Sequence, residues 1–193
     1  MRAMFACMYY GGLRPAETLG LRNADCYLPK EGWGELTLEQ TRPEAGKQWT
    51  DSGEVHDDRG LKHRAEHETR LVPIPPTLVS ILVAHIETHS TASDGRLFRT
   101  SRGRPFAASA INGVWAHART LALTPMQVIS PLAQTPYDLR HAAVSLWLNA
   151  GVPATEVAER AGHGVDVLLK VYAKCIDGQR EIVNRRIEEA LGF

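Results

Sequence analysis

The chain has 193 residues, of which 44% are hydrophobic and 23% are charged. This balance is typical of a folded globular protein and excludes a disordered or fibrous chain. The length predicts one domain, at roughly 150 residues per domain. The longest apolar stretch, residues 78–86, includes Ser80 and His85, and it is too short to cross a membrane, which takes about 20 apolar residues.

The net charge of zero conceals an uneven distribution. Residues 31–58 hold eight acidic and two basic residues, so the other 165 residues hold 20 basic and 14 acidic ones. The basic residues concentrate in two groups: Arg59, Lys62, Arg64 and Arg70, then Arg96, Arg99, Arg102 and Arg104. Such a group is either a solvated loop or a strip that faces the phosphates of a nucleic acid.

The cysteine pattern gives no disulfide framework. The three cysteines, Cys7, Cys26 and Cys175, are odd in number and lack the C-x-x-C spacing. They predict reduced thiols in a cytoplasmic protein and no zinc site.

The first half of the chain predicts short helices and a small sheet. We expect helices over residues 2–10 and 15–21, the second opened by a proline that suits a first helical turn. Residues 33–40 alternate apolar and polar side chains as a half-buried strand does, and residues 69–73 form a second strand. The long connection at 41–60 leaves room for one more strand near 48–50. We therefore expect an antiparallel sheet of two or three strands.

The second half reads as helices, because apolar residues recur at i, i+3 and i+4. We expect Ser109 and Thr135 to be N-caps, and Asp166 to cap the segment that carries Tyr172. The expected helices cover residues 78–86, 109–121, 135–150, 153–161, 166–172 and a last stretch from residue 177. The fold class is therefore mainly α with a small antiparallel β-sheet (α+β).

Several chemically useful side chains stand where helices begin or break or, for Lys62, in the turn before a strand. They are Arg14, Lys62, Tyr137, Arg140, His141, His163 between two glycines, and Tyr172 nine residues after it. Four segments carry most of them: GGLRPAETL at 11–19, PYDLRH at 136–141, RAGH at 160–163 and VY at 171–172. In order and spacing these segments resemble the catalytic motifs of the tyrosine recombinases, the phage-integrase family, and the resemblance extends over nearly all of residues 1–193.

The resemblance implies an activity and a role for each of these residues. The protein would be a site-specific DNA recombinase that breaks and rejoins double-stranded DNA through a 3′-phosphotyrosyl intermediate, with Tyr172 as the nucleophile. Arg14 and Arg140 would bind the non-bridging phosphate oxygens. Lys62 would protonate the leaving 5′-oxygen, and His163 would hydrogen-bond the phosphate.

One position departs from the family pattern. Tyr137 stands where the family most often has histidine. A phenol still donates a hydrogen bond to phosphate, but it cannot carry a proton at neutral pH as an imidazole can. His141, one turn away, is expected to support its helix rather than to contact the substrate.

These roles are chemically reasonable. Guanidinium groups match two phosphate oxygens and stay charged at any working pH, and each donor to developing charge typically lowers a barrier by ~2.7–4 kcal/mol. Because a covalent intermediate retains the bond energy, neither a cofactor nor a metal is required. The sequence has no P-loop and no carboxylate cluster suited to two Mg²⁺ ions. The pairs His63/His67 and His85/His89 have helical spacing but lack a third zinc ligand.

The expected assembly is a homo-oligomer, a tetramer on DNA, with a monomer in isolation left open. Val183, Ile187 and Leu191 form an apolar stripe on the last helix, which packs either on its own core or on a neighbouring protomer. The first motif follows the start of the chain closely, so we expect a single catalytic domain that lacks the N-terminal DNA-clamping domain. No membrane association is expected, and the protein would work in the cytoplasm with the nucleoid.

Three alternatives stay open at this point. A type IB topoisomerase-like enzyme would use the same chemistry on one strand. A DNA-binding remnant would have lost catalysis, as Tyr137 and a missing N-terminal domain permit. A helical partner-binding protein would use the stripe on the last helix.

Overall fold

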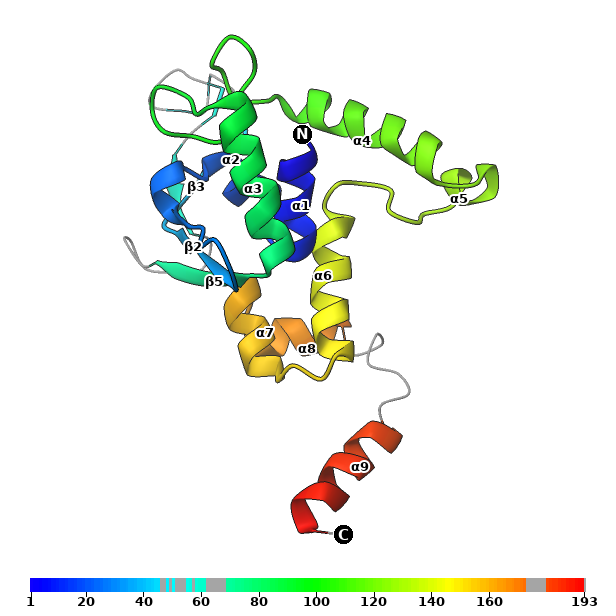
Figure 1. The fold of residues 1–193 in the computed structure, drawn as a ribbon. Helices are drawn as coiled ribbons and strands as arrows, with labels where there is room; N and C mark the ends of the chain where they lie inside the picture. The colour runs from blue at the N-terminus through cyan, green and yellow to red at the C-terminus, as the bar shows by residue number, and fades with distance from the viewer. Residues whose placement is uncertain are drawn as a thin grey trace. The chain divides into compact units, whose positions relative to one another are not determined.

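The computed structural model describes residues 1–45, 48, 50, 55–56, 58–61, 69–172 and 180–192. They belong to two compact units, residues 1–143 and residues 144–193 (Figure 1). Helices predominate and are accompanied by small antiparallel β-structure, which confirms the fold class predicted from the sequence. Among the described residues, no helix has both the length and the apolar character that crossing a membrane requires.

The first unit holds the sheet and most of the helices. Its helices are α1 (Arg2–Tyr10), α2 (Pro15–Gly20), α3 (Pro76–His89), α4 (Ala108–Ala122) and α5 (Pro125–Ile129), with a 3-10 turn at Asn23–Asp25. Helix α6 (Asp138–Asn149) begins in the first unit and continues into the second. The helices that the sequence predicts from residues 2 and 15 are present, and the strand pattern at 69–73 corresponds to β5 (Arg70–Ile74).

The main sheet has three antiparallel strands in the order β1–β2–β5. These are β1 (Cys26–Tyr27), β2 (Gly34–Leu38) and β5. Leu36 lies opposite both Cys26 and Val72. Gly34 is required at the start of β2, because a Cβ there would lie 2.6 Å from the carbonyl oxygen of Tyr27.

The third strand of the main sheet is β1, and not a strand near residues 48–50 as the sequence suggested. Gln48 has 3-10 geometry and Thr50 has no regular structure, so the strand considered near 48–50 is wrong for these two residues. The extra pairing comes from a separate two-stranded ribbon of β3 (Gln40–Thr41) and β4 (Arg59–Gly60). This ribbon is too short for an alternating pattern to reveal it.

The core of the first unit lies between the sheet, α1 and α3, which are neighbours in Figure 1. Leu36, Leu38, Val72 and Ile74 project from the strands into a cluster of fully buried helix residues. That cluster includes Met4, Cys7 and Met8 of α1 and Leu78 and Leu82 of α3. Burying a side chain of this size contributes about 1.5–3 kcal/mol, so this core fixes the start of α2 and the strand β5.

Two helix starts differ from the prediction. Helix α4 begins at Ala108, with Ala107 and not Ser109 as N-cap. The Ala108 amide donates to a carboxylate oxygen of Glu44 at 2.8 Å, which replaces a cap from the neighbouring sequence. Helix α6 begins at Asp138, whose carboxylate accepts a hydrogen bond from the Thr135 amide at 2.8 Å.

The second unit contains the end of α6, then α7 (Ala154–Ala161), α8 (Val165–Tyr172) and α9 (Arg180–Leu191). Helix α7 ends at Gly162, which takes the left-handed conformation (φ 63°) that glycine adopts without strain. Asp166 lies inside the first turn of α8 and therefore does not cap it, contrary to the prediction. A small core forms from seven residues: Val144, Leu148, Val157, Ala158, Ala161, Leu168 and Tyr172.

Candidate active site

The first motif forms the start of α2. Arg14 is the N-cap residue, and Pro15 occupies the first turn. The Arg14 amide donates to Glu17 Oε2 at 2.7 Å, and its guanidinium Nη1 donates to Glu17 Oε1 at 2.6 Å. The acidic residue three positions into the helix therefore holds both the backbone and the side chain of Arg14.

Glu17 is itself fully buried and is shared by three arginines. Arg70 of β5 donates two hydrogen bonds to its carboxylate, of 2.9 and 2.8 Å. Arg140 of α6 brings its Nη1 to 3.9 Å from Glu17 Oε2 and also donates to the Gly12 carbonyl. Arg14 and Arg140, from the first two motifs, therefore lie together at one carboxylate. They are more than 120 positions apart in the sequence.

The electrostatics of this cluster keep Glu17 and Arg140 charged. Burial alone would raise the pKa of Glu17, but Arg70, Arg14 and Arg140 together lower that pKa to about 2. Burial, and next the positive charge of Arg14, lower the pKa of Arg140 to about 10, which leaves it protonated at neutral pH. Paired, charged guanidinium groups in a poorly solvated place are suited to bind a phosphate diester.

Tyr137 lies at the edge of this cluster. Its ring stands edge-on to that of His141 with centroids 5.0 Å apart. Tyr137 also lines a cavity of about 240 Å³ with Pro15, Ile111 and Pro136. With 36% of its surface exposed, its phenol is open to a ligand.

His163 and Tyr172 are neighbours in the second unit. Their ring centroids are 6.3 Å apart and the rings are nearly perpendicular, at 68°. Tyr172 ends the described part of α8 and is only 2% exposed, packed beside Leu168 and Val157. The nine-residue step between the two motifs therefore places the imidazole beside the phenol.

Some predicted residues cannot be placed, and others were missed. Lys62 lies outside the described residues, as do His63, His67 and Cys175. The sequence interpretation overlooked Glu17 and Arg70. Glu17 stands three residues after an N-cap, where an acid typically reaches back to the helix start. Arg70 shares the inward face of β5 with Val72 and Ile74, and a charge at such a position signals a buried partner.

No metal centre emerges from the described ranges, where no group of three or more His, Cys, Asp and Glu side chains could hold an ion. His85 and His89 are neighbours with ring centroids 4.9 Å apart. The His85 Nε2 is 3.0 Å from the Leu97 carbonyl oxygen, so that nitrogen is engaged by the backbone. The residues of the arginine cluster are donors to anions, not ligands of cations.

Comparison with known proteins identifies the family. The model of the phage integrase family matches residues 1–177. The chain belongs to this family. The resemblance read from the four motifs is therefore confirmed, and the four segments lie within the matched range.

Two curated relatives of this integrase-family chain extend the comparison. A protein named tyrosine recombinase XerC from Nitrobacter winogradskyi is 28% identical over 181 residues, which are 92% of this chain and 46% of the relative. An integrase from Streptomyces ambofaciens is 30% identical over 128 residues, 61% of this chain and 32% of the relative. The chain thus spans less than half the length of these two relatives.

Solved structures share the fold. The Tn1549 transposon integrase, in complex with transposon right end DNA, superposes with a TM-score of 0.72 at 18% identity, over 99% of this chain and 58% of that one. The XerH site-specific recombinase, bound to palindromic difH substrate in a post-cleavage complex, gives a TM-score of 0.68 at 15% identity, over 100% of this chain and 45% of that one.

Proposed function

We propose that this chain is the catalytic domain of a site-specific DNA recombinase that breaks and rejoins double-stranded DNA. The observation that carries the proposal is the meeting of Arg14 and Arg140 at Glu17. Two motifs far apart in sequence supply guanidinium groups to one place, where they can bind the non-bridging oxygens of one phosphate. The family membership of residues 1–177 supports the same reaction.

In the proposed reaction, the Tyr172 oxygen attacks phosphorus and passes its proton to solvent water. The bond from phosphorus to the 5′-oxygen breaks, a bond from phosphorus to the phenolic oxygen forms, and Lys62 supplies the proton that the 5′-oxygen takes up. Attack by another 5′-hydroxyl reverses these steps and joins the strands. The bond energy is retained in the intermediate, so the reaction needs no nucleotide cofactor and no metal.

The other site residues stabilise the charge that develops on the phosphate. His163 and Tyr137 donate hydrogen bonds to it, and Arg14 and Arg140 neutralise it. Each such donor contributes ~2.7–4 kcal/mol to lowering the barrier in well-studied enzymes. Because Tyr172 is 2% exposed, we propose that its side chain leaves the apolar cluster before it attacks.

We also propose the setting in which the domain works. Residues 1–193 act as one catalytic domain, on DNA in the cytoplasm, with four protomers assembled on the duplex. The exposed stripe of α9 supports such assembly: Val183, Ile187 and Leu191 are 43%, 52% and 64% exposed.

The test is covalent trapping on nicked duplexes whose bases around the nick are randomised. After attack beside the nick, a short fragment diffuses away and leaves the enzyme joined to the DNA. We expect a detergent-resistant adduct from the intact chain and none from Tyr172→Phe. Duplex binding without any adduct would favour the non-catalytic remnant, and relaxation of supercoiled plasmid without recombinant products would favour a topoisomerase-like enzyme. Absence of duplex binding would favour the partner-binding protein.

A further inference from the structure

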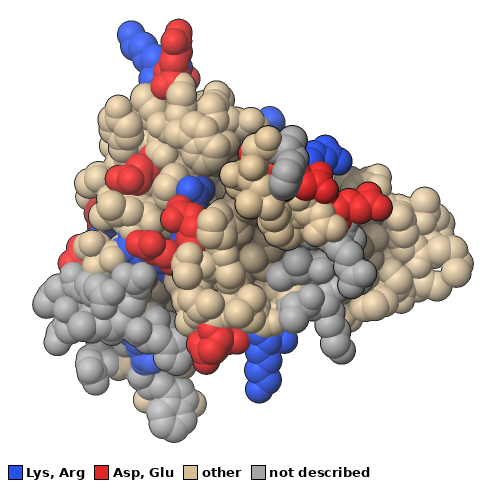
Figure 2. Space-filling view, turned by 90° about the horizontal axis from the view of Figure 1, so that it is seen from below, with Lys and Arg blue, Asp and Glu red and all other residues tan. Residues whose placement is uncertain are grey.

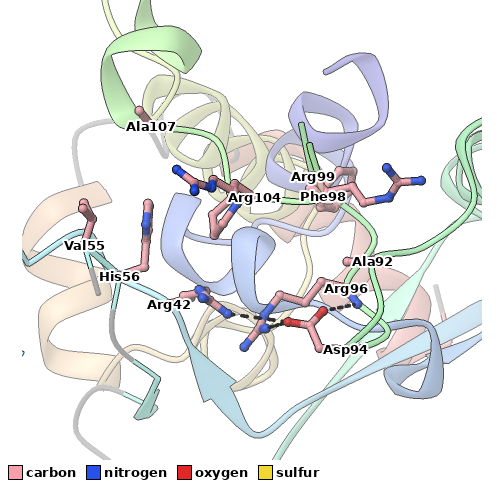
Figure 3. A pocket seen from close by; sticks show the side chains of 12 residues that line it. Arg42, Val55, His56, Ala92, Asp94, Arg96, Phe98, Arg99, Arg104 and Ala107 are labelled. Atoms are coloured by element: carbon pink, nitrogen blue, oxygen red, sulfur yellow. Dashed lines mark hydrogen bonds and ion pairs between the residues drawn. The ribbon is translucent and has the colours of Figure 1, made fainter. Parts of the chain in front are cut away.

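A second basic site lies in the first unit, in a cavity of about 490 Å³. Its wall carries four arginines, one aspartate and a histidine, most of them labelled in Figure 3: Arg42, Arg96, Arg99, Arg104, Asp94 and His56. Neither Arg14 nor Arg140 is among its lining residues. A volume of this size exceeds what one phosphate ion needs and falls in the range of small-molecule pockets, ~300–1,000 Å³.

Carboxylates neutralise the floor of this cavity. Arg96 pairs with Asp94 and, at 2.6 Å, with Asp58. Arg42 lies farther from the same two acids, at 3.7 Å from Asp58 and 3.9 Å from Asp94. Two acids are therefore shared between these two arginines, and Arg96 holds the closer contacts.

Among the described lining residues, the opposite wall carries no acid. Arg104 is exposed, and within the described residues its guanidinium has neither a hydrogen bond nor an ion pair; it points toward the side of the cavity where His56 lies (Figure 3). Arg99 instead turns away and donates to the His89 carbonyl at 2.8 Å. The cavity thus keeps at least one cation that no described carboxylate balances.

His56 gives an independent indication of a ligand. It is only 8% exposed, and among the described residues its Nε2 has no hydrogen-bond partner. A buried polar group left without a partner costs about 1–3 kcal/mol, so such groups are rare unless something else satisfies them. Here the imidazole lines a cavity that also holds an unbalanced guanidinium.

We propose that this cavity binds a phosphate of the DNA backbone other than the one at which the strand is cut, with Arg104, Arg42 and His56 as its donors. The inference rests on the proposed function, since it supplies a further contact to the same duplex. The proposal also decides between a solvated loop and a phosphate-facing strip for the basic group at 96–104. Arg96 is buried and ion-paired, and Arg102 is exposed to solvent. Arg104 is the residue of this group that would face the phosphate.

The acidic and basic side chains seen in Figure 2 are interspersed on that face of the described residues. The described residues drawn there form no broad basic surface that would hold a duplex by charge alone. The cavity, which both Arg104 and His56 line, therefore gives the chain a contact that would position the duplex. The neutral composition of the chain does not lead one to expect such a contact.

The test is the salt dependence of duplex binding, measured by fluorescence anisotropy on the full chain. Each phosphate contact contributes about 0.9 to the slope of log K against log salt concentration. We expect Arg104→Gln to reduce the slope by about that amount. Arg102→Gln is the matched control, since Arg102 is exposed in the same loop but does not line the cavity; it should leave the slope unchanged. Equal slopes for the two variants would overturn the proposal.

A second experiment distinguishes binding of a DNA phosphate in the cavity from binding of a free anion. Inorganic phosphate is titrated while the His56 ring signals are followed by NMR. A response to millimolar phosphate, together with a DNA slope that Arg104→Gln leaves unchanged, would assign the cavity to a free anion and overturn the DNA contact. A His56→Gln variant should weaken duplex binding less than His56→Phe does, because the amide retains a donor.

The failure of this proposal is distinct from failure of the proposed function. At saturating DNA, Arg104→Gln should still form the covalent adduct, since Arg104 takes no part in the chemistry. If the wild type forms the adduct but Arg104→Gln leaves the salt slope of DNA binding unchanged, the cavity proposal is wrong and the proposed function stands. If the wild type forms no adduct, the proposed reaction is wrong, and the salt-slope experiment still tests whether the cavity binds a DNA phosphate.

Discussion

Arg70 holds Glu17 with both of its terminal nitrogens, at 2.9 and 2.8 Å, and both side chains are buried. The pair ties the strand β5 to the first turn of α2. Because Arg14 and Arg140 contact the same carboxylate, its position determines where both guanidinium groups lie. We therefore regard Glu17 and Arg70 as the positioning residues of the candidate site.

Glu17→Gln should strongly destabilise the protein. It removes the one carboxylate that the three arginines are seen to share and leaves their charges close together. Loss of one partner from a buried ion pair costs about 3–5 kcal/mol, to be measured by urea unfolding. Glu31→Gln, on the exposed turn before β2, is the control and should change the free energy of unfolding by less than ~0.5 kcal/mol. Similar losses in both variants would contradict the role of Glu17.

The same carboxylate predicts how stability depends on acidity. Its pKa is about 2 in the folded state against a usual value of 4.5, so the folded state binds fewer protons than the unfolded one. Its stabilisation is present above about pH 4.5 and is lost as the pH falls toward 2, an amount of order 3 kcal/mol. The stability difference between wild type and Glu17→Gln should shrink over this range. A constant difference down to the lowest pH at which the protein folds would contradict the assignment.

Arg70→Lys and Arg70→Met test positioning separately from contact with DNA. Lysine cannot form the two parallel hydrogen bonds, and methionine removes the charge. Adduct formation at saturating DNA should slow in the order wild type, Arg70→Lys, Arg70→Met, while the salt slope of DNA binding stays unchanged. A change in the slope would mean that Arg70 contacts phosphate directly.

Tyr137→His should accelerate adduct formation near neutral pH. The imidazole is a proton carrier in this range, whereas a phenol is not, and the half-exposed position accommodates the change. The rate should also become dependent on pH between about 5 and 8. Tyr27→His, at a 66% exposed position of β1, should leave the rate as it is. An unchanged rate in Tyr137→His would show that residue 137 does not contact the reacting phosphate.

Deletion of residues 177–193 tests the stripe on α9. Its three apolar side chains are exposed, so the shortened chain should keep its folded circular dichroism spectrum and unfold cooperatively. It should fail to assemble into oligomers on duplex DNA in analytical ultracentrifugation. If the deletion unfolds the chain, the stripe packs on its own core instead.

The sequence predicted those parts of the fold that depend on patterns among residues close together in the chain. The helix expected over 78–86 follows from apolar spacing and lies within α3, and the break at Gly162 follows from a glycine. The resemblance to the family singled out His163 and Tyr172, but only the structure shows that their rings are neighbours. The ribbon of β3 and β4 escaped because strands of two residues have no period. The start of α4 was missed because its capping carboxylate, Glu44, is 64 residues away.

The buried pair of Glu17 and Arg70 shows the same limit at the candidate site. The residues are 53 positions apart, and although the strand pattern places Arg70 on an inward face, nothing near it in the sequence identifies Glu17 as its partner. Only the strand register, which turns Arg70 inward with Val72, and the packing of β5 near α2 bring them together. Long-range pairing of this kind is not encoded in any short window of sequence.

In the proposed reaction, the Tyr172 oxygen becomes covalently joined to a DNA phosphate held by Arg14 and Arg140. The most direct measurement is mass spectrometry of the proteolysed adduct formed on a nicked duplex. We predict one nucleotide-bearing peptide, which contains Tyr172, and its loss in Tyr172→Phe, Arg14→Ala and Arg140→Ala. A modified peptide that lacks Tyr172, or an adduct that persists in Tyr172→Phe, would contradict the account.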